Sequence, residues 1–357
     1  MNGDGIAYVF VLQGNREKEK RIAAERITAF LQFWVFGVTI KRRIFWKVRK
    51  PLNIGGDNML FTNKSNKFAK DPAVVNLQGT YFLYYTILYE RLSGGNLKIG
   101  VGIAKSSDME NWEEIGEVPL EQECEQKGIG APAAIVIDGK VNLFYQTYGS
   151  WEKDAICHAV SEDGIHFVKN PDNPILRPSA DWCCGRAIDA DVCIFRNKLY
   201  LYYATRDHAF RIQKVGGAYA EVDSDFSKKA WTQIGRQALV APEMKWEGEC
   251  IEAPATIVND GKLFLFYGGS YNCTPQQIGV AVSEDGAFFE KLSAEPFLRC
   301  GKEGDWNSCE SGHPYAFRDE DGRAYLFYQG TNDMGQTWYL SKVEIGFDEN
   351  NMPYMIE

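Results

Sequence analysis

The sequence predicts an all-β protein, a five-bladed β-propeller with four-stranded blades and a short basic N-terminal extension. One aromatic segment recurs five times, reading TYFLYYT in its first copy and KLYLYYATRD in its third. Its central leucines are separated by 60, 58, 64 and 61 residues, and no long helical pattern follows residue 50. Such a repeat indicates a propeller in which each blade is one copy. The five leucines are Leu83, Leu143, Leu201, Leu265 and Leu326.

The surroundings of each aromatic segment predict the other strands of a blade. A short apolar run, such as PAVVNLQG or PAAIVIDG, precedes the segment and ends in residues that favour hairpin turns. A third strand and another turn follow, as in HAVSEDGIHF and VAVSEDGAFF. The acidic residues of these turns, Asp108, Asp163 and Asp285, repeat in register, so we expect them to cap turns rather than to carry function.

Composition separates the first 50 residues from the remainder of the 357-residue chain. The whole chain has a net charge of −9, which argues against a general nucleic-acid binder. Residues 1–50 contain 11 Lys and Arg against 4 Asp and Glu, whereas the remainder contains 28 against 44. We therefore expect an N-terminal extension over residues 1–50 and a propeller catalytic domain over residues 52–350.

The extension contains the apolar run ITAFLQFWVFGVTI, which has 14 residues between basic flanks. A membrane-spanning helix needs about 20 such residues. We favour an irregular segment or a helix packed on the domain, and membrane contact through residues 27–46 is the alternative. A cytoplasmic location is favoured over membrane association.

The cysteines do not form a recognisable framework of disulfides or metal ligands. Nine cysteines are present, an odd number, without a CxxC pair. This pattern predicts reduced thiols in a reducing compartment, and it does not predict a zinc site.

Several carboxylates fall at the inner end of the predicted blades. Twelve residues before the central leucines stand Asp71, Ala131, Asp189, Ala253 and Pro314. One position earlier in the last two copies are Glu252 and His313. These positions begin the strand nearest the propeller axis, and because Ala131 shows that the fold does not require an acid there, we expect the acids to converge for function.

Converging carboxylates suit acid–base chemistry. Burial and mutual repulsion move their pKa values apart. A deprotonated carboxylate that activates water and a protonated one that donates to a leaving oxygen are the basic requirements for glycoside hydrolysis.

At these residues the chain resembles glycoside hydrolase family 43 over about residues 52–345. The resemblance is carried by KDPAVV, AIDADVCIF and CIEAPATIV, with His313 in SGHPYAF. It implies an inverting hydrolase of α-L-arabinofuranosides or β-D-xylosides. Asp71 would be the catalytic base, Glu252 the general acid, and Asp189 the residue that modulates the pKa of the acid.

The third motif departs from the family pattern, because Ala190 replaces the usual proline and Asp191 adds a carboxylate. Either Asp189 or Asp191 faces the axis, depending on the regularity of strand pairing. Related propeller glycosidases that act on fructosides or anhydrogalactosides share this layout. A non-catalytic carbohydrate-binding propeller and a scaffold for protein partners are further alternatives.

The substrate is expected to be an oligosaccharide or an aryl or alkyl glycoside. Sugar rings pack on aromatic side chains and bind polar groups, so substrate-binding roles are predicted for a set of loop residues and the fifth-blade histidine. That set is Trp151, Trp182, Arg206 and His313, with Tyr271 and Trp306 in comparable loops. Arg186 is expected to be an ion-pair partner. No cofactor is predicted, and a structural calcium near His313 is an alternative by family analogy.

Overall fold

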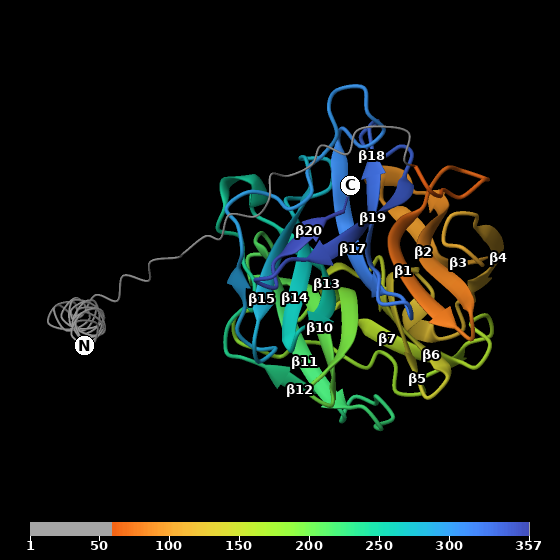
Figure 1. The fold of residues 1–357 in the computed structure, drawn as a ribbon. Coiled ribbons are helices and arrows are strands. Elements are labelled where there is room, and N and C mark those ends of the chain that lie inside the picture. The colour runs from red at the N-terminus through yellow and green to blue at the C-terminus, as the bar shows by residue number, and fades with distance from the viewer. Residues whose placement is uncertain (1–58, 357) are drawn as a thin grey trace, which may run out of the picture. The chain divides into compact units, whose positions relative to one another are not determined.

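The computed structural model describes residues 59–356, which form the predicted five-bladed β-propeller (Figure 1). Each blade is an antiparallel sheet of four strands that are consecutive in the sequence. The predicted extension and the proposed membrane contact of residues 27–46 lie outside the described residues. Within the described part, no helix is long and apolar enough to cross a membrane.

The strands are named in chain order, four to a blade. Blade 1 comprises β1 (Lys70–Leu77), β2 (Thr80–Arg91), β3 (Leu97–Ser106) and β4 (Glu113–Val118). Blade 2 comprises β5 (Ile129–Ile137), β6 (Lys140–Thr147), β7 (Ile156–Ser161) and β8 (Val168–Lys169). Blade 3 comprises β9 (Ile188–Phe195), β10 (Lys198–Arg206), β11 (Gln213–Glu221) and β12 (Thr232–Ile234). Blade 4 comprises β13 (Ile251–Asn259), β14 (Lys262–Gly269), β15 (Gln277–Ser283) and β16 (Glu290–Lys291). Blade 5 comprises β17 (Glu310–Arg318), β18 (Ala324–Thr331), β19 (Tyr339–Phe347) and β20 (Pro353–Met355), so its last strand lies beyond residue 350.

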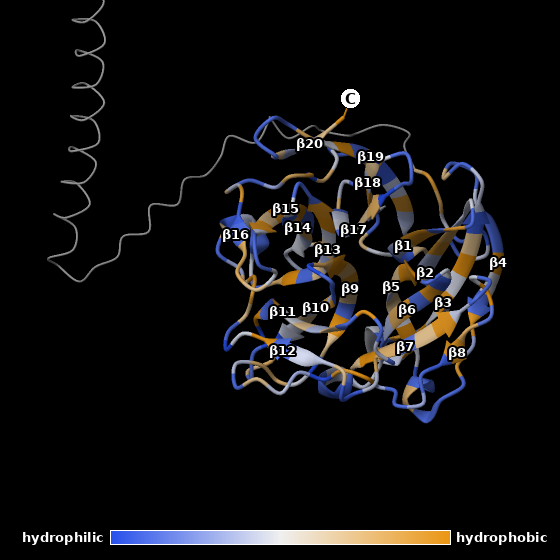
Figure 2. Ribbon diagram, turned by 60° about the horizontal axis from the view of Figure 1, so that its bottom comes forward, coloured by the Kyte–Doolittle hydropathy of each residue, from blue (hydrophilic) through white to orange (hydrophobic). Residues whose placement is uncertain are grey.

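Short 3-10 helices lie in the connections between strands. They are η1 (Ser93–Gly95), η2 (Glu123–Glu125), η3 (Trp151–Lys153) and η4 (Lys245–Glu247). In Figure 2 the first strand of every blade lies towards the middle of the ring and the fourth towards the periphery. The start of each first strand is therefore available to build a central site.

The aromatic second strands fill the space between blades. Tyr84 of β2 is completely buried, and its hydroxyl donates a hydrogen bond of 2.9 Å to the carbonyl of Gly164 in the next blade. Gly164 has φ of +77°, and a Cβ there would meet the ring of Phe82 at 2.9 Å. Tyr202 contacts Gly286 in the same way, from blade 3 to blade 4. Both glycines belong to the SEDG turns, which therefore combine a positive φ with close packing between blades.

The acidic residues of these turns have the structural role that we predicted. Ser161 accepts a hydrogen bond from the backbone N–H of Gly164, and Asp163 accepts hydrogen bonds from the N–H groups of Ile165 and His166. The same pattern recurs at Asp108 and Asp285. All nine cysteines are unpaired, as predicted.

The ring closes between blade 5 and blade 1 by backbone pairing. Phe68, just ahead of β1, forms a parallel bridge with Trp338. Gln213 and Cys250 form the equivalent bridge between blades 3 and 4. The junction between the first and last blades thus has the same geometry as a junction within the chain, although 270 residues separate its bridged partners.

Buried ion pairs fasten two of the connections between blades. In blade 4, Lys291 Nζ lies 2.6 Å from both carboxylate oxygens of Glu247, and the Tyr267 hydroxyl donates to Glu247 Oε1 at 2.8 Å. Glu247 also accepts hydrogen bonds from two backbone N–H groups of its own turn. In blade 2, Lys169 and Glu125 form the equivalent pair at 3.0 Å.

Removal of one partner should leave an uncompensated buried charge. We expect Lys291→Met to lower the free energy of unfolding by about 3–5 kcal/mol, measured by equilibrium denaturation in urea. Lys262→Met is the matched control, because its ion pair with Glu284 is 3.7 Å long and exposed; there the expected loss is about 0–1 kcal/mol. Equal losses in the two variants would show that the buried pair does not stabilise the blade.

Candidate active site

Five residues, one from each blade, occupy the same backbone position near the start of the first strand. Each lies where a β-bulge shifts the strand register. Their φ angles lie between 42° and 51°, a conformation that costs about 1–3 kcal/mol for a residue with a side chain. Proline follows in every blade except the third, where the next residue is Ala190, and proline suits a bulge because it has no N–H to pair. These ring residues are Asp71, Ala131, Asp189, Ala253 and His313.

The bulges correct the register that the sequence had suggested. Pro314 was expected at the fifth ring position, but His313 occupies it because the turn between β17 and β18 is one residue longer than that of blade 4. Glu252 stays one residue ahead of its ring residue, Ala253. It therefore occupies the position that Lys70 has in blade 1, and the three acids do not occupy equivalent positions.

Side chains of the preceding blade hold the ring residues in place. In four of the five blades, the backbone N–H of the ring residue donates a hydrogen bond to such a side chain. The pairs are Asp71 with Gln329 (3.0 Å), Ala131 with Thr86 (2.8 Å), Asp189 with Gln146 (2.7 Å) and His313 with Gln276 (3.1 Å). The position of each functional residue thus depends on its neighbouring blade.

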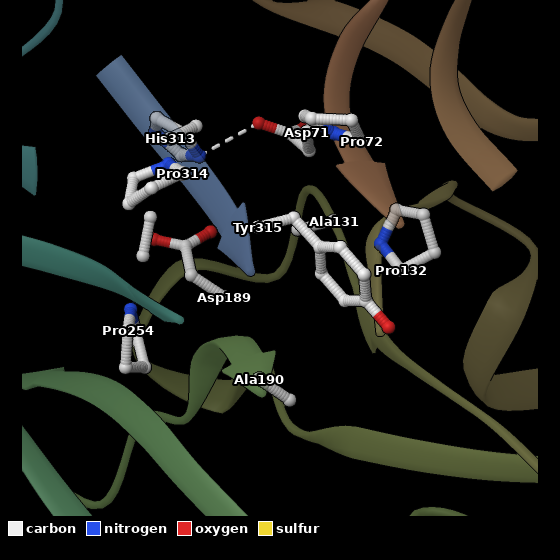
Figure 3. A pocket seen from close by; sticks show the side chains of 11 residues that line it. Asp71, Pro72, Ala131, Pro132, Asp189, Ala190, Pro254, His313, Pro314 and Tyr315 are labelled. Carbon is white, nitrogen blue, oxygen red and sulfur yellow. Dashed lines mark ion pairs between the residues drawn. The ribbon is translucent and has the colours of Figure 1, made fainter. Parts of the chain in front are cut away.

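Asp71 is held in its ionised form. Its Oδ1 forms an ion pair of 2.7 Å with His313 Nδ1, and its Oδ2 accepts a hydrogen bond of 2.6 Å from Thr86 (Figure 3). Burial alone would raise the pKa of Asp71, but the charges of His313 and Lys70 and these contacts lower it well below its usual value.

Glu252 is held by two glutamines and the same histidine. Gln276 Nε2 donates to Glu252 Oε1 at 2.6 Å, and Gln213 Nε2 donates to Glu252 Oε2. His313 Nε2 lies 3.1 Å from Glu252 Oε1. Burial opposes ionisation of Glu252, yet the contacts with His313 and Gln276 lower its pKa below the usual value.

His313 lies between Asp71 and Glu252, with one ring nitrogen directed to each. Burial lowers its pKa, but the charge of Asp71 and the contacts with both carboxylates raise the pKa well above the usual value. The ring is therefore an imidazolium that donates in both directions. Because the two acids contact opposite nitrogens, a full imidazole ring separates their nearest oxygens.

Asp189 is the acid that carries a proton near neutral pH. Burial raises its pKa to about 7, the charges of Glu252 and Asp71 raise it further, and His313 opposes them. Its Oδ2 is buried without a hydrogen-bond partner. The predicted separation of pKa values is present, but the raised value belongs to Asp189 and not to Glu252.

The choice between Asp189 and Asp191 is also clear from the structure. Asp189 lines the central pocket. Asp191 accepts hydrogen bonds from the backbone N–H and the hydroxyl of Thr256 in blade 4. Burial raises the pKa of Asp191 to about 7 as well, so it is a neutral partner within the interface between blades.

These residues open into a pocket of about 230 Å³. A separate cavity of about 20 Å³, enough for about one water molecule, is lined by the ring residues and their successors (Figure 3). The larger pocket is lined by Phe68, Lys70, Asp71, Thr86, Leu97, Ile99, Gln146, Tyr148, Arg186, Ile188, Asp189, Arg206, Gln213, Glu252, Tyr271, Asn272 and His313.

Of the predicted substrate-binding residues, His313 and Arg206 line this pocket, and Tyr271 does too. Trp151 and Trp182 do not: Trp151 is 59% exposed in η3, and the indole N–H of Trp182 is buried without a partner. Trp306 is buried against Tyr328, as expected of a packing residue.

Several residues of the pocket were not identified from the sequence. Lys70 directly precedes Asp71, a position that could have drawn attention to it. Gln213 and Gln276 gave no signal, because uncharged amides are common and lie outside the repeated strand starts. Glu310 is buried behind the pocket, where it accepts hydrogen bonds from Gln329 and from the N–H of Cys273.

One group among the described residues has the geometry to hold a metal ion. The ligand atoms of Asp189, Glu252 and His313 lie within 4.8 Å of one another. Calcium takes six to eight oxygen ligands, whereas here both nitrogens of His313 already contact carboxylates and a protonated imidazole is not a ligand. The residues as arranged do not fit calcium.

The propeller is similar in fold to several solved glycoside hydrolases. A thermostable family-43 glycoside hydrolase shares 19% identity and a TM-score of 0.67, over 84% of this chain and 96% of that one. An endo-1,4-beta-xylanase from Bacteroides thetaiotaomicron shares 20% identity and a TM-score of 0.62, over 82% and 96%. An alpha-L-arabinofuranosidase from Lactobacillus brevis shares 16% identity and a TM-score of 0.59, over 81% and 94%.

The sequence itself matches the profile described as Glycosyl hydrolases family 43 over residues 64–349. This range covers all five first strands and therefore the whole ring of functional residues. The chain belongs to glycosyl hydrolase family 43, and it is a glycosidase.

Proposed function

We propose that this glycosidase hydrolyses α-L-arabinofuranosides or β-D-xylosides with inversion of the anomeric carbon. The observation that carries the proposal is the placement of Asp71 and Glu252 on opposite nitrogens of His313, with the protonated Asp189 beside them. The choice of sugar is supported by the two proteins of similar fold whose names specify a xylanase and an arabinofuranosidase.

Asp71 is proposed as the base that polarises the attacking water. Its pKa lies far below neutrality, so the carboxylate is ionised whenever the fold is intact. The His313 ring between Asp71 and Glu252 leaves more space than the roughly 5–5.5 Å between the carboxyl groups of retaining enzymes, and inverting enzymes use roughly 6.5–9.5 Å to accommodate a water molecule.

Glu252 is proposed as the donor to the leaving oxygen, with Asp189 as the source of its proton. In the ligand-free site His313 and Gln276 favour the ionised form of Glu252, whereas Asp189 is protonated up to about pH 7. Ligand atoms of the two acids lie within 4.8 Å, so they titrate as a pair that shares one proton. Transfer of this proton to Glu252 prepares the acid for departure of the leaving group.

Removal of either proposed catalytic carboxylate should abolish most turnover. We expect Asp71→Asn and Glu252→Gln each to reduce kcat/KM by about 10²–10⁴-fold, measured by release of 4-nitrophenol from the α-L-arabinofuranoside and the β-D-xyloside. Asp191→Asn is the matched control and should retain activity, because Asp191 faces blade 4. Wild-type protein that cleaves neither substrate would move the assignment to fructosides, anhydrogalactosides or a binding function.

The stereochemistry of the product tests the spacing of the two acids. Proton NMR during the first turnovers should show the anomer opposite to that of the substrate, before mutarotation mixes the two. Initial release of the same anomer would exclude the proposed direct attack of water and would require a nucleophile closer to the anomeric carbon.

The rate should depend on the proton of the Asp189–Glu252 pair. Asp189 loses that proton as pH rises through about 7, so kcat/KM is expected to fall above this pH, while Asp71 stays ionised throughout. The limb should vanish in Asp189→Asn and persist in Asp191→Asn, whose residue also has a pKa of about 7.

Stability needs a separate measurement in that experiment. Between about pH 4 and pH 7 the folded protein retains protons on Asp189 and Asp191 that the unfolded chain has lost, so the free energy of unfolding falls as pH rises. Rates are therefore normalised to the folded fraction. A limb near pH 7 that survives in Asp189→Asn would assign the titration to another group, such as His313.

A further inference from the structure

The pocket treats its negative and positive groups differently. The ionised acids have their contacts filled within the protein: Asp71 by His313 and Thr86, and Glu252 by His313, Gln213 and Gln276. A ligand that enters therefore meets no ionised carboxylate that lacks a partner.

Two of the cations, in contrast, lack matching acceptors. Arg186 is 91% buried at its side chain (9% exposed), its Nε has no hydrogen-bond partner, and its ion pair with Asp154 spans 3.8 Å. Lys70 Nζ lies 4.5 Å over the ring of Trp338, and no hydrogen bond or ion pair joins it to any described residue. An unsatisfied buried donor costs about 1–3 kcal/mol, and more when it is charged.

The two cations lie on the same side of the pocket. Both line it, and both also act on Tyr148, whose pKa burial raises and the charges of Lys70 and Arg186 lower. Burial lowers the pKa of Lys70, but Asp71, Glu310 and Glu252 raise it above the usual value, so the ammonium stays charged.

The remaining charged groups of the pocket do not change this asymmetry. Arg206 is anchored, because its Nε donates to Gln213 at 2.8 Å and its guanidinium packs on the rings of Phe210 and Tyr271. His313 is shared between two acids. Lys70 and Arg186 thus present cationic donors that the protein itself does not use.

We propose that the saccharide accepted by this pocket carries a carboxylate, as a uronic acid residue does, and that Arg186 and Lys70 bind it. A neutral pentose offers only hydroxyl groups, which do not compensate a buried charge. The planar fork of a guanidinium matches the two oxygens of a carboxylate, and such charge-assisted contacts are about twice as strong as neutral ones. The inference rests on the proposed saccharide substrate and specifies its chemical class.

Calorimetric titration of the full-length protein tests the assignment with sugars that differ only at C5. D-Glucuronate is compared with D-glucose and D-xylose, and D-galacturonate with D-galactose. We expect at least one uronate to bind about tenfold more tightly than its neutral counterparts, as a charge-assisted contact implies. Equal affinities, no detectable binding, or tighter binding of a 6-sulfated sugar than of the uronate would overturn the proposal.

Variants locate the preference. Arg186→Gln and Lys70→Gln should each reduce the ratio of uronate to neutral affinity, and Arg186→Lys should restore part of it by keeping the charge. Arg211→Gln is the matched control: it also removes one positive charge, but its side chain is 65% exposed and paired with Glu249 outside the pocket. Thermal unfolding of each variant confirms that it is folded, and an unchanged ratio in a folded Arg186→Gln protein would contradict the role of Arg186.

The outcomes separate this inference from the proposed function. Cleavage of neutral pentosides by a protein without preference for uronates would overturn the inference and leave the proposed function standing. Binding of uronates without cleavage of any pentoside would do the reverse.

Discussion

The active site depends on one backbone feature, the β-bulge at the start of every first strand. The bulge turns a residue with positive φ towards the axis, and a glutamine or threonine of the preceding blade accepts its N–H in four of the five blades. Because the hydrogen bond crosses from blade to blade, closure of the ring and placement of the acids are one problem. Even the last of these bonds, from Asp71 to Gln329, connects residues 258 apart in sequence.

The electrostatics follow from this placement. His313 reaches the axis from the same backbone position as Asp71, with Glu252 one residue ahead of the ring in blade 4, so a single imidazolium contacts both acids. Asp189, also a ring residue, lacks such a contact and is the acid that holds a proton. The difference in pKa between Asp71 and Asp189 therefore arises from neighbours and not from burial, which both share.

Much of the fold could be predicted from the sequence, because a propeller repeats the same local chemistry five times. The aromatic strands, the Ser-Asp turns and the Asp-Gly hairpins all recur, and the structure uses each copy in the same way. The convergence of Asp71, Asp189 and Glu252 was also predictable, since they interrupt that repetition. What could not be predicted depends on bulges and on contacts between distant blades. A register shift is silent in the sequence, so the true fifth ring residue was missed, and so were Gln276 and Lys70, whose importance lies only in what they face.

The ring also contains two positions that function has not used. Ala131 and Ala253 have the same strained backbone as Asp71, Asp189 and His313, and they line the same axial cavity. Their backbone conformation is already set by the neighbouring strands, so a new side chain there would need no rearrangement of the main chain. The fold thus separates the scaffold from the chemistry, and glycosidases of this architecture can diversify by changing single side chains at positions that are built in advance.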